Sequence, residues 1–231
     1  MSLPFYVSPE QVMQDKAEYA RKGIGRGKSS ITLEYAGGIA LMAENTSTLS
    51  KIGEIYDRIA FAGVGKFSEF DQLRKIGVRY ADMKGYQYSR DDVRGRALAN
   101  AYSQAIGDAF TRELKPLEVE LIVAEVGDPG LAGHEQNEIY RVQFDGSISD
   151  HRNFCVIGGS EDELRSHLST NYRPDQPLGD ILRLGRTALG RANDGKLVAP
   201  ENLEVCILEK TRIGRKFRRL NADELRQHLS G

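Results

Sequence analysis

The chain has 231 residues, of which 40% are hydrophobic, and its 32 Lys and Arg residues nearly balance its 33 Asp and Glu residues. This balance argues against a dedicated nucleic-acid or membrane-surface protein, because both normally carry an excess of basic residues. No segment approaches the ~20 apolar residues that span a bilayer, and no linker rich in Pro, Gly or Ser divides the sequence. We therefore expect a single domain over residues 1–231.

The first predicted element is a helix over residues 8–22. Ser8 supplies an N-cap hydroxyl, Pro9 occupies the first helical position, and Gln11 completes a capping box. Gly23 is expected to end the helix. Its apolar stripe is weak, so the helix needs another surface to lie on. A basic, glycine-rich turn follows it.

Alternating apolar residues predict strands over much of the remaining chain, and tight turns such as Asp145-Gly146 join them into hairpins. The predicted strands cover residues 29–35, 39–44, 51–58, 59–64, 117–126, 138–144, 153–157, 203–209 and 216–220. Helical spacing predicts helices that begin at the caps Ser68, Ser89, Ser160 and Asn221, and a further helix over residues 178–192.

The order of these elements indicates the fold class. Strand pairs joined by tight turns imply antiparallel pairing, and helices that arrive in pairs imply layers over sheets rather than crossovers between parallel strands. The sequence therefore predicts an α+β fold, a four-layer α/β/β/α sandwich of two antiparallel sheets. The sandwich is expected over residues 29–209, with a C-terminal strand and helix in residues 210–231.

Two features favour a cytoplasmic protein. The first residues, 1–5, lack the basic region and apolar run of a secretory signal. Cys155 and Cys206 each lie within an apolar, strand-like run, which predicts buried free thiols rather than a disulfide. Free thiols fit a reducing compartment.

The glycine-rich segment of residues 23–29 invites comparison with a phosphate-binding loop. That motif needs four residues between its first Gly and its Gly-Lys-Ser/Thr, and only three separate Gly23 from Gly27. The order of elements is also reversed, because a helix precedes the segment and a strand follows it. A nucleotide-binding module is the weaker hypothesis, and a connector that leads into a strand is favoured.

Other site chemistry has little support. The histidines are scattered, without Cys or carboxylates at ligand spacing, so neither a metal nor another cofactor is expected: His134, His151, His167 and His228. Residues 212–219 contain five cations, but acidic residues lie nearby. A solvated strand edge or a subunit contact is therefore favoured there over a nucleic-acid site.

Several stretches together carry a family resemblance: residues 18–21 (Glu-Tyr-Ala-Arg), 29–43, 51–60, 145–146 and 157–160. In these stretches the chain resembles the α-type subunits of the proteasome core particle, over roughly residues 8–209, and most of all their actinobacterial branch. The resemblance implies the N-terminal-nucleophile hydrolase fold, which agrees with the layer order. It also implies heptameric α rings stacked on rings of catalytic β subunits.

The resemblance also bears on catalysis. The family's β subunits use an N-terminal Thr whose own amine acts as base, helped by an Asp and a Lys. The matching positions here are Ser29, Asn45 and Lys51. Since 28 residues precede Ser29 and Asn45 is uncharged, the resemblance implies a non-catalytic subunit. The alternative is that residues 1–28 are removed and Ser29 becomes an N-terminal nucleophile.

For α subunits the resemblance assigns other duties. It implies that Lys51 lies in a pocket between neighbouring subunits and binds the C-terminal carboxylate of the tail of a ring-shaped ATPase or other activator, with Gly65 at the pocket wall. Residues 1–7 match a gating segment whose apolar residues would cluster about the ring axis: Leu3, Phe5, Tyr6 and Val7. Pro9 matches the turn proline of the gate and Tyr19 its supporting aromatic residue. The implied substrates are unfolded proteins, marked in the actinobacterial branch by a small ubiquitin-like protein.

Overall fold

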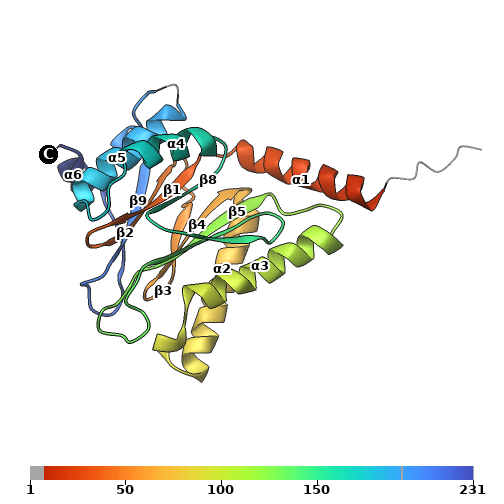
Figure 1. Cartoon of the computed structure of the whole chain (residues 1–231), viewed down its shortest axis with the longest axis horizontal. Coiled ribbons are helices and arrows are strands. Elements are labelled where there is room, and N and C mark those ends of the chain that lie inside the picture. Colours follow the sequence, from red (N-terminus) through yellow and green to blue (C-terminus); the bar gives the residue numbers. More distant parts are fainter. Residues whose placement is uncertain (1–7, 194, 231) are drawn as a thin grey trace, which may run out of the picture.

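The computed structural model describes residues 8–193 and 195–230 (Figure 1). Its elements follow one another as α1 (Pro9–Gly25), β1 (Ser30–Tyr35), β2 (Gly38–Glu44), β3 (Ile52–Tyr56), β4 (Ile59–Gly65), α2 (Phe67–Gln87), η1 (Arg90–Asp92), α3 (Gly95–Arg112), β5 (Val119–Glu125), β6 (Glu138–Val142), β7 (Ile148–His151), β8 (Phe154–Ile157), α4 (Glu161–Asn171), α5 (Leu178–Arg191), η2 (Pro200–Asn202), β9 (Leu203–Glu209), β10 (Phe217–Arg219) and α6 (Ala222–Ser230). No helix in the described ranges is both long enough and apolar enough to cross a membrane.

The strands form two antiparallel sheets. One has the order β10-β9-β2-β1-β8 and the other β3-β4-β5-β6-β7. Figure 1 shows α4, α5 and α6 over the first sheet and α2 and α3 over the second. The predicted four-layer α/β/β/α sandwich is therefore confirmed.

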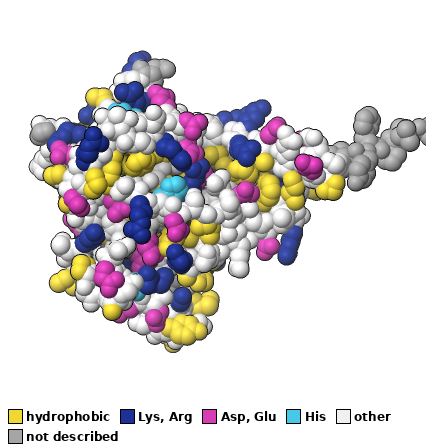
Figure 2. Space-filling view, in the orientation of Figure 1, with side chains coloured by type: hydrophobic (Ala, Val, Ile, Leu, Met, Phe, Trp, Pro, Cys, Tyr) yellow, Lys and Arg dark blue, Asp and Glu magenta, His cyan; other side chains and the backbone are white. Residues whose placement is uncertain are grey.

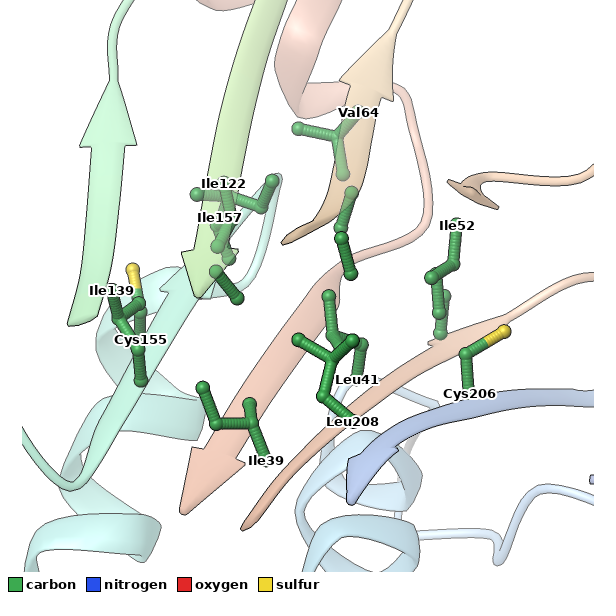
Figure 3. Packing of buried hydrophobic residues seen from close by; sticks show 14 of the residues in the cluster. Ile39, Leu41, Ile52, Val64, Ile122, Ile139, Cys155, Ile157, Cys206 and Leu208 are labelled. Carbon is green, nitrogen blue, oxygen red and sulfur yellow. The ribbon is translucent and has the colours of Figure 1, made fainter. Parts of the chain in front are cut away.

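Three apolar clusters hold the four layers together. The middle cluster lies between the sheets, where Ile39 and Leu41 of one sheet face Val64 and Ile122 of the other (Figure 3). The two outer clusters join each sheet to its helices. Because β2 contributes to both faces of its sheet, all but its last residue are buried.

Both cysteines belong to the middle cluster. Cys155 and Cys206 are buried and free, as predicted. Burial in this apolar layer raises the pKa of each thiol to about 12. Neither thiol is therefore ionised at neutral pH.

Only part of helix α1 is packed against the sheets. Its C-terminal half buries Ala20 and Ile24 in the middle cluster and packs on β4 and β5, whereas its N-terminal half projects beyond the sheets (Figure 1). The prediction that Gly23 ends the helix was wrong, since α1 continues to Gly25. The burial of Ile24 favours the extra turn, and the tight packing of Gly23 against the Glu118 side chain leaves no room for a Cβ there.

The helix caps were predicted with mixed success. Ser8 accepts a hydrogen bond from Gln11 N at 3.2 Å, but the Gln11 side chain turns to Asp15 instead of closing the box. In the last helix the predicted cap is complete, because Asn221 Oδ1 accepts from Glu224 N and Glu224 Oε2 accepts from Asn221 N.

Two predicted serine caps were wrong, and a third serine stands at the N-cap position without making the capping hydrogen bond. Helix α2 begins one residue before Ser68, and the Ser160 side chain makes no capping bond at α4. Ser89 caps the short 3₁₀ helix η1 rather than α3. At α3 the Glu125 carboxylate reaches over from β5 and accepts from Gly95 N at 2.7 Å. A distant carboxylate thus replaces the local cap.

One strand was missed. The turn at Asp145-Gly146 joins β6 to β7, which pairs Ile148 with Val142, and the strand predicted over residues 153–157 belongs to the other sheet as β8. Strand β7 lies at a sheet edge and Ile148 is its one apolar residue apart from the ring of His151, so it lacks the alternation that marks a half-buried strand.

Candidate functional site

The candidate site lies where α1 ends and β1 begins. Ser29 is 4% exposed, and its Oγ accepts a hydrogen bond from Ser160 N at 3.4 Å. The Gly158 backbone passes so close that a Cβ there would lie 2.9 Å from the Ser29 Cα. The backbone nitrogen of Ser29 is part of the peptide bond to Lys28, so it is an amide rather than an amine.

Lys51 precedes β3 and faces that same peptide. Its Nζ donates to the carbonyl oxygens of Lys28 and Glu44, both at 3.0 Å. Burial lowers the pKa of Lys51, while the carboxylates of Glu204 and Glu44 oppose that shift and Lys28 adds to it. The structure thus brings Lys51 to the Ser29 region, and uncharged oxygens hold its ammonium.

Asn45 shapes the loop after β2. Its amide nitrogen donates to Leu49 O at 2.8 Å and to Glu204 Oε2 at 2.7 Å. Position 45 therefore carries no carboxylate, as expected, but the expectation that Lys51 lacks an acidic partner was wrong. Glu204 of β9 and Glu44 of β2 both lie close enough to act on the charge of Lys51.

Glu204 reaches the site because β9 pairs with β2, which sets Glu204 opposite Ala43. Its carboxylate accepts from Lys51 N at 2.9 Å and from Ile52 N at 3.2 Å, and Arg219 also binds it. No local spacing in the sequence signals this contact, because 153 positions separate Glu204 from Lys51. Only the strand order reveals it.

A second lysine lies on the solvent side of the same segment. Lys28 Nζ is 3.2 Å from Glu44 Oε2 and donates to Asn193 Oδ1 at 2.6 Å. Asn193 Nδ2 in turn donates to Glu44 Oε2 at 2.6 Å. The Lys28 side chain is 49% exposed and that of Glu44 only 12%. We refer to Lys28, Glu44 and Asn193 as the Lys28 triad.

Gly65 ends β4 beside this segment. A Cβ added to Gly27 would lie 3.4 Å from Gly65 N, so Gly65 and Lys51 flank the Gly27-Lys28 segment. Gly65 has φ +99°, and a Cβ there would meet Glu118 O at 1.9 Å. The fold itself therefore demands glycine at this position.

The other predicted site residues lie on α1 or before it. Pro9 is at the first helical position and Tyr19 is ten positions further on, about 15 Å along the axis, so the two do not meet within one chain. Tyr19 is 48% exposed, and Lys115 Nζ lies 5.6 Å from its ring centroid. The other four predicted gate residues fall in residues 1–7, outside the described part of the chain: Leu3, Phe5, Tyr6 and Val7.

Tyr19 also lines a groove of about 720 Å³ between α1 and the loop after α3. Val12 and Leu114 lie at the same groove, and Leu114 is 98% exposed. Figure 2 shows hydrophobic side chains gathered on this projecting arm. The arm thus carries apolar surface that no residue in the described ranges covers.

The basic segment of residues 212–219 is largely neutralised. Arg215 pairs with Glu54, Lys216 with Asp128, and Arg218 with Glu224. Strand β10, which carries Arg218, lies at the edge of its sheet, as one of the two favoured interpretations predicted. Among the described residues no three His, Cys, Asp or Glu side chains are grouped so that they could hold a metal ion.

Comparisons with known proteins agree on one family. A family model described as "Proteasome subunit" matches residues 24–208. A protein of Thermobifida fusca named "Proteasome subunit alpha" is 50% identical over 231 residues, which cover 99% of this chain and 91% of the relative. Proteins of the same name from Kineococcus radiotolerans and Acidimicrobium ferrooxidans are 51% and 48% identical, and cover 100% and 99% of this chain and 99% and 97% of their own lengths.

Proposed function

The chain belongs to the proteasome α-subunit family, of the actinobacterial type, and on that basis we propose that it is a non-catalytic, gate-forming subunit of the core particle. Catalysis is assigned to partner β subunits, with which rings of this chain assemble. Neighbouring copies of the chain are the second class of partner, and the cytoplasm is the proposed location.

One observation carries the non-catalytic assignment. Ser29 occupies the nucleophile position, yet its nitrogen is an amide whose neighbouring carbonyl, that of Lys28, accepts from Lys51. An amide nitrogen cannot act as the base that an N-terminal nucleophile requires. Although Lys51 and two carboxylates are present, the proton acceptor is not.

Helix α1 argues against the alternative in which residues 1–28 are removed. Its Ala20 and Ile24 are 0% and 6% exposed within the middle cluster. Removing the helix would uncover the apolar ends of β4 and β5, at a cost of roughly 25 cal/mol for each Å² of apolar surface exposed. A helix so packed is part of the folded subunit.

Peptide hydrolysis tests this assignment. We expect the purified chain to cleave no peptide, and the particle assembled with β subunits to cleave peptides at a rate that Ser29→Ala leaves unchanged. Hydrolysis by the chain alone, abolished by Ser29→Ala, would support the alternative instead.

We further propose that Lys51 docks activator tails. One N–H of its ammonium remains for a further acceptor after the two carbonyl contacts, because an ammonium has three donors. A tail carboxylate bound there would gain a charge-assisted hydrogen bond, and several tails on one ring would bind with avidity. Ring-shaped ATPases that deliver unfolded, tagged proteins are the proposed partners.

Residues 1–7 are proposed to close the pore, with Pro9 and Tyr19 as their supports. Deleting residues 1–7 in the assembled particle should raise basal peptide hydrolysis, because the apolar plug at the ring axis is lost. An unchanged rate would remove the gate from the proposal, whereas the docking role of Lys51 would stand. Deleting residues 228–231 at the other terminus is the control.

A further inference from the structure

The Lys28 triad lies beside the proposed docking lysine. Lys28 contributes its backbone carbonyl to Lys51 Nζ, and its own side chain carries a second ammonium on the solvent side of the same segment. Two cations therefore lie on one segment, the Lys51 ammonium at the Lys28 carbonyl and the Lys28 ammonium at Glu44 and Asn193. Such a pair suits a carboxylate better than a single buried lysine does.

The two lysines differ in their partners. Lys51 Nζ is bonded to carbonyl oxygens, which carry no net charge. Lys28 Nζ is bonded to Glu44 at 3.2 Å, and Glu44 Oε1 makes no hydrogen bond within the described residues. One oxygen of the Glu44 carboxylate thus makes both of these contacts, with Lys28 and with Asn193.

An ion pair of this type exchanges partners readily. The Lys28 side chain is 49% exposed, so anions from solvent can reach its ammonium, while the Glu44 side chain is 12% exposed and is also bound by Asn193. Glu204, in contrast, is engaged by the backbone of Lys51 and Ile52 and by Arg219, so it is not free to leave. Glu44 is therefore the carboxylate that an incoming anion can replace.

We propose that Lys28 is a second binding residue for the tail carboxylate, and that Glu44 is an internal carboxylate which the tail displaces from it. This inference rests on the proposed docking role of Lys51. In the free subunit the Glu44 carboxylate is bound to Lys28, and Asn193 forms hydrogen bonds with both side chains. When a tail binds, its carboxylate lies between Lys28 and Lys51, while Asn193 Nδ2 keeps its bond to Glu44.

Opposite effects of two conservative substitutions test the proposal. Lys28→Gln removes one of the two cations and should weaken binding about tenfold, which is about 1.4 kcal/mol. Glu44→Gln removes the competing anion and keeps an acceptor for Asn193, so it should tighten binding about threefold or more. Lys28→Arg restores the cation and should recover most of the affinity.

The probe is a short labelled peptide ending in Tyr-Ala with a free carboxylate, and its C-terminal amide. Its affinity for the particle assembled with β subunits is measured by fluorescence anisotropy. Lys75→Gln and Asp71→Asn are matched controls, because Lys75 pairs with Asp71 at 2.7 Å with similar exposures of 61% and 19%, on α2. Particle size is checked for every variant.

The outcomes separate this inference from the proposed function. If the wild-type particle binds acid and amide equally, carboxylate docking fails and this inference fails with it. If the wild type prefers the acid but Lys28→Gln binds it as tightly as the wild type does, or Glu44→Gln binds it more weakly, docking stands and the role of Lys28 and Glu44 is refuted. The loss in Lys28→Gln should also shrink at high salt, since Lys28 is exposed.

Discussion

The two ends of strand β4 carry charged clusters that are built in opposite ways. At its start, Arg58, Glu125 and His134 have side chains that are 8%, 2% and 8% exposed, and they bond chiefly to one another. At its other end lie Lys51 and Lys28, whose ammonium groups bind carbonyls or a readily exchanged carboxylate. The first group, which we call the closed cluster, can only stabilise the fold. The second group, the open cluster, can exchange its partners.

The closed cluster ties distant segments together. Glu125 Oε1 lies 3.1 Å from His134 Nδ1, Glu125 Oε2 accepts from Gly95 N at 2.7 Å, and the carboxylate pairs with Arg58 at 3.4 Å. A β5 carboxylate thus fixes the start of α3, the loop that follows β5 and the turn before β4. Such contacts stabilise tertiary structure because no water can replace them.

The largest effect is expected when this closed cluster is broken. Glu125→Ala leaves the buried Arg58 without its buried partner carboxylate, with the exposed Asp91 at 3.8 Å, and should lower the free energy of unfolding by about 3–5 kcal/mol. Urea unfolding of the purified chain measures this loss. In the control, Asp71→Ala removes a surface carboxylate and should cost less than about 1 kcal/mol. Equal losses in the two variants would contradict the distinction between closed and open charges.

A backbone substitution at the far end of β4 should have the next largest effect. Gly65→Ala forces a side chain onto a residue with φ +99° and into the Glu118 carbonyl oxygen. The strain alone should cost about 1–3 kcal/mol in the same urea experiment. Gly25→Ala, which meets nothing within 4 Å, is the matched control and should cost nothing measurable. If Gly65→Ala left the free energy of unfolding unchanged, the backbone at this end of β4 would be able to adjust to a side chain, contrary to its geometry.

Lys51→Ala should separate binding from stability. Among the described residues the ammonium donates to two carbonyls, which water can reach once the side chain is gone, so the loss in unfolding free energy should stay below about 1 kcal/mol. Binding of a tail carboxylate should weaken by about 1.5–3 kcal/mol, and activator-stimulated proteolysis should disappear. Native mass spectrometry should still find intact rings. Unchanged stimulation would refute docking at Lys51.

The smallest effect is a pH dependence. Burial lowers the pKa of Lys51 below its ordinary 10.5. Between the folded and the ordinary value the unfolded chain binds a proton that the folded chain does not, so stability should rise with pH across that window. Tail binding should fall in the same window, because neutral Lys51 no longer attracts a carboxylate. Peptide affinity measured from about pH 7 to pH 10 checks this. Lys51→Arg keeps its charge, and a profile identical to that of the wild type would contradict the assignment.

The sequence predicted what depends on local pattern. Alternation over residues 29–44 gave the β1–β2 hairpin, and Asn221 with Glu224 gave the cap of α6. Regular apolar spacing also yielded the layer order, since each helix or strand shows its buried face in its own residues. Lys51 and Gly65 were selected by family resemblance, and the structure brings both to the Gly27-Lys28 segment.

What the sequence could not reveal depends on contacts between distant residues. The cap of α3 comes from Glu125, thirty positions after Gly95, and local Ser89 was the more obvious candidate. Glu204 reaches Lys51 only because β9 lies beside β2. Strand β7 has too few apolar residues to be predicted from its own sequence, because it is defined by its pairing with β6. Long-range pairing decides these details.

The central claim is that Ser29 stays within the chain and has no amine to take up a proton. It is tested most directly by the intact masses of all chains in a working particle treated with a covalent, peptide-based inhibitor of N-terminal nucleophiles. The account predicts an α chain that retains the segment before Ser29 and carries no label, with the label on the β chains. An α chain that begins at Ser29 and carries the inhibitor would contradict it.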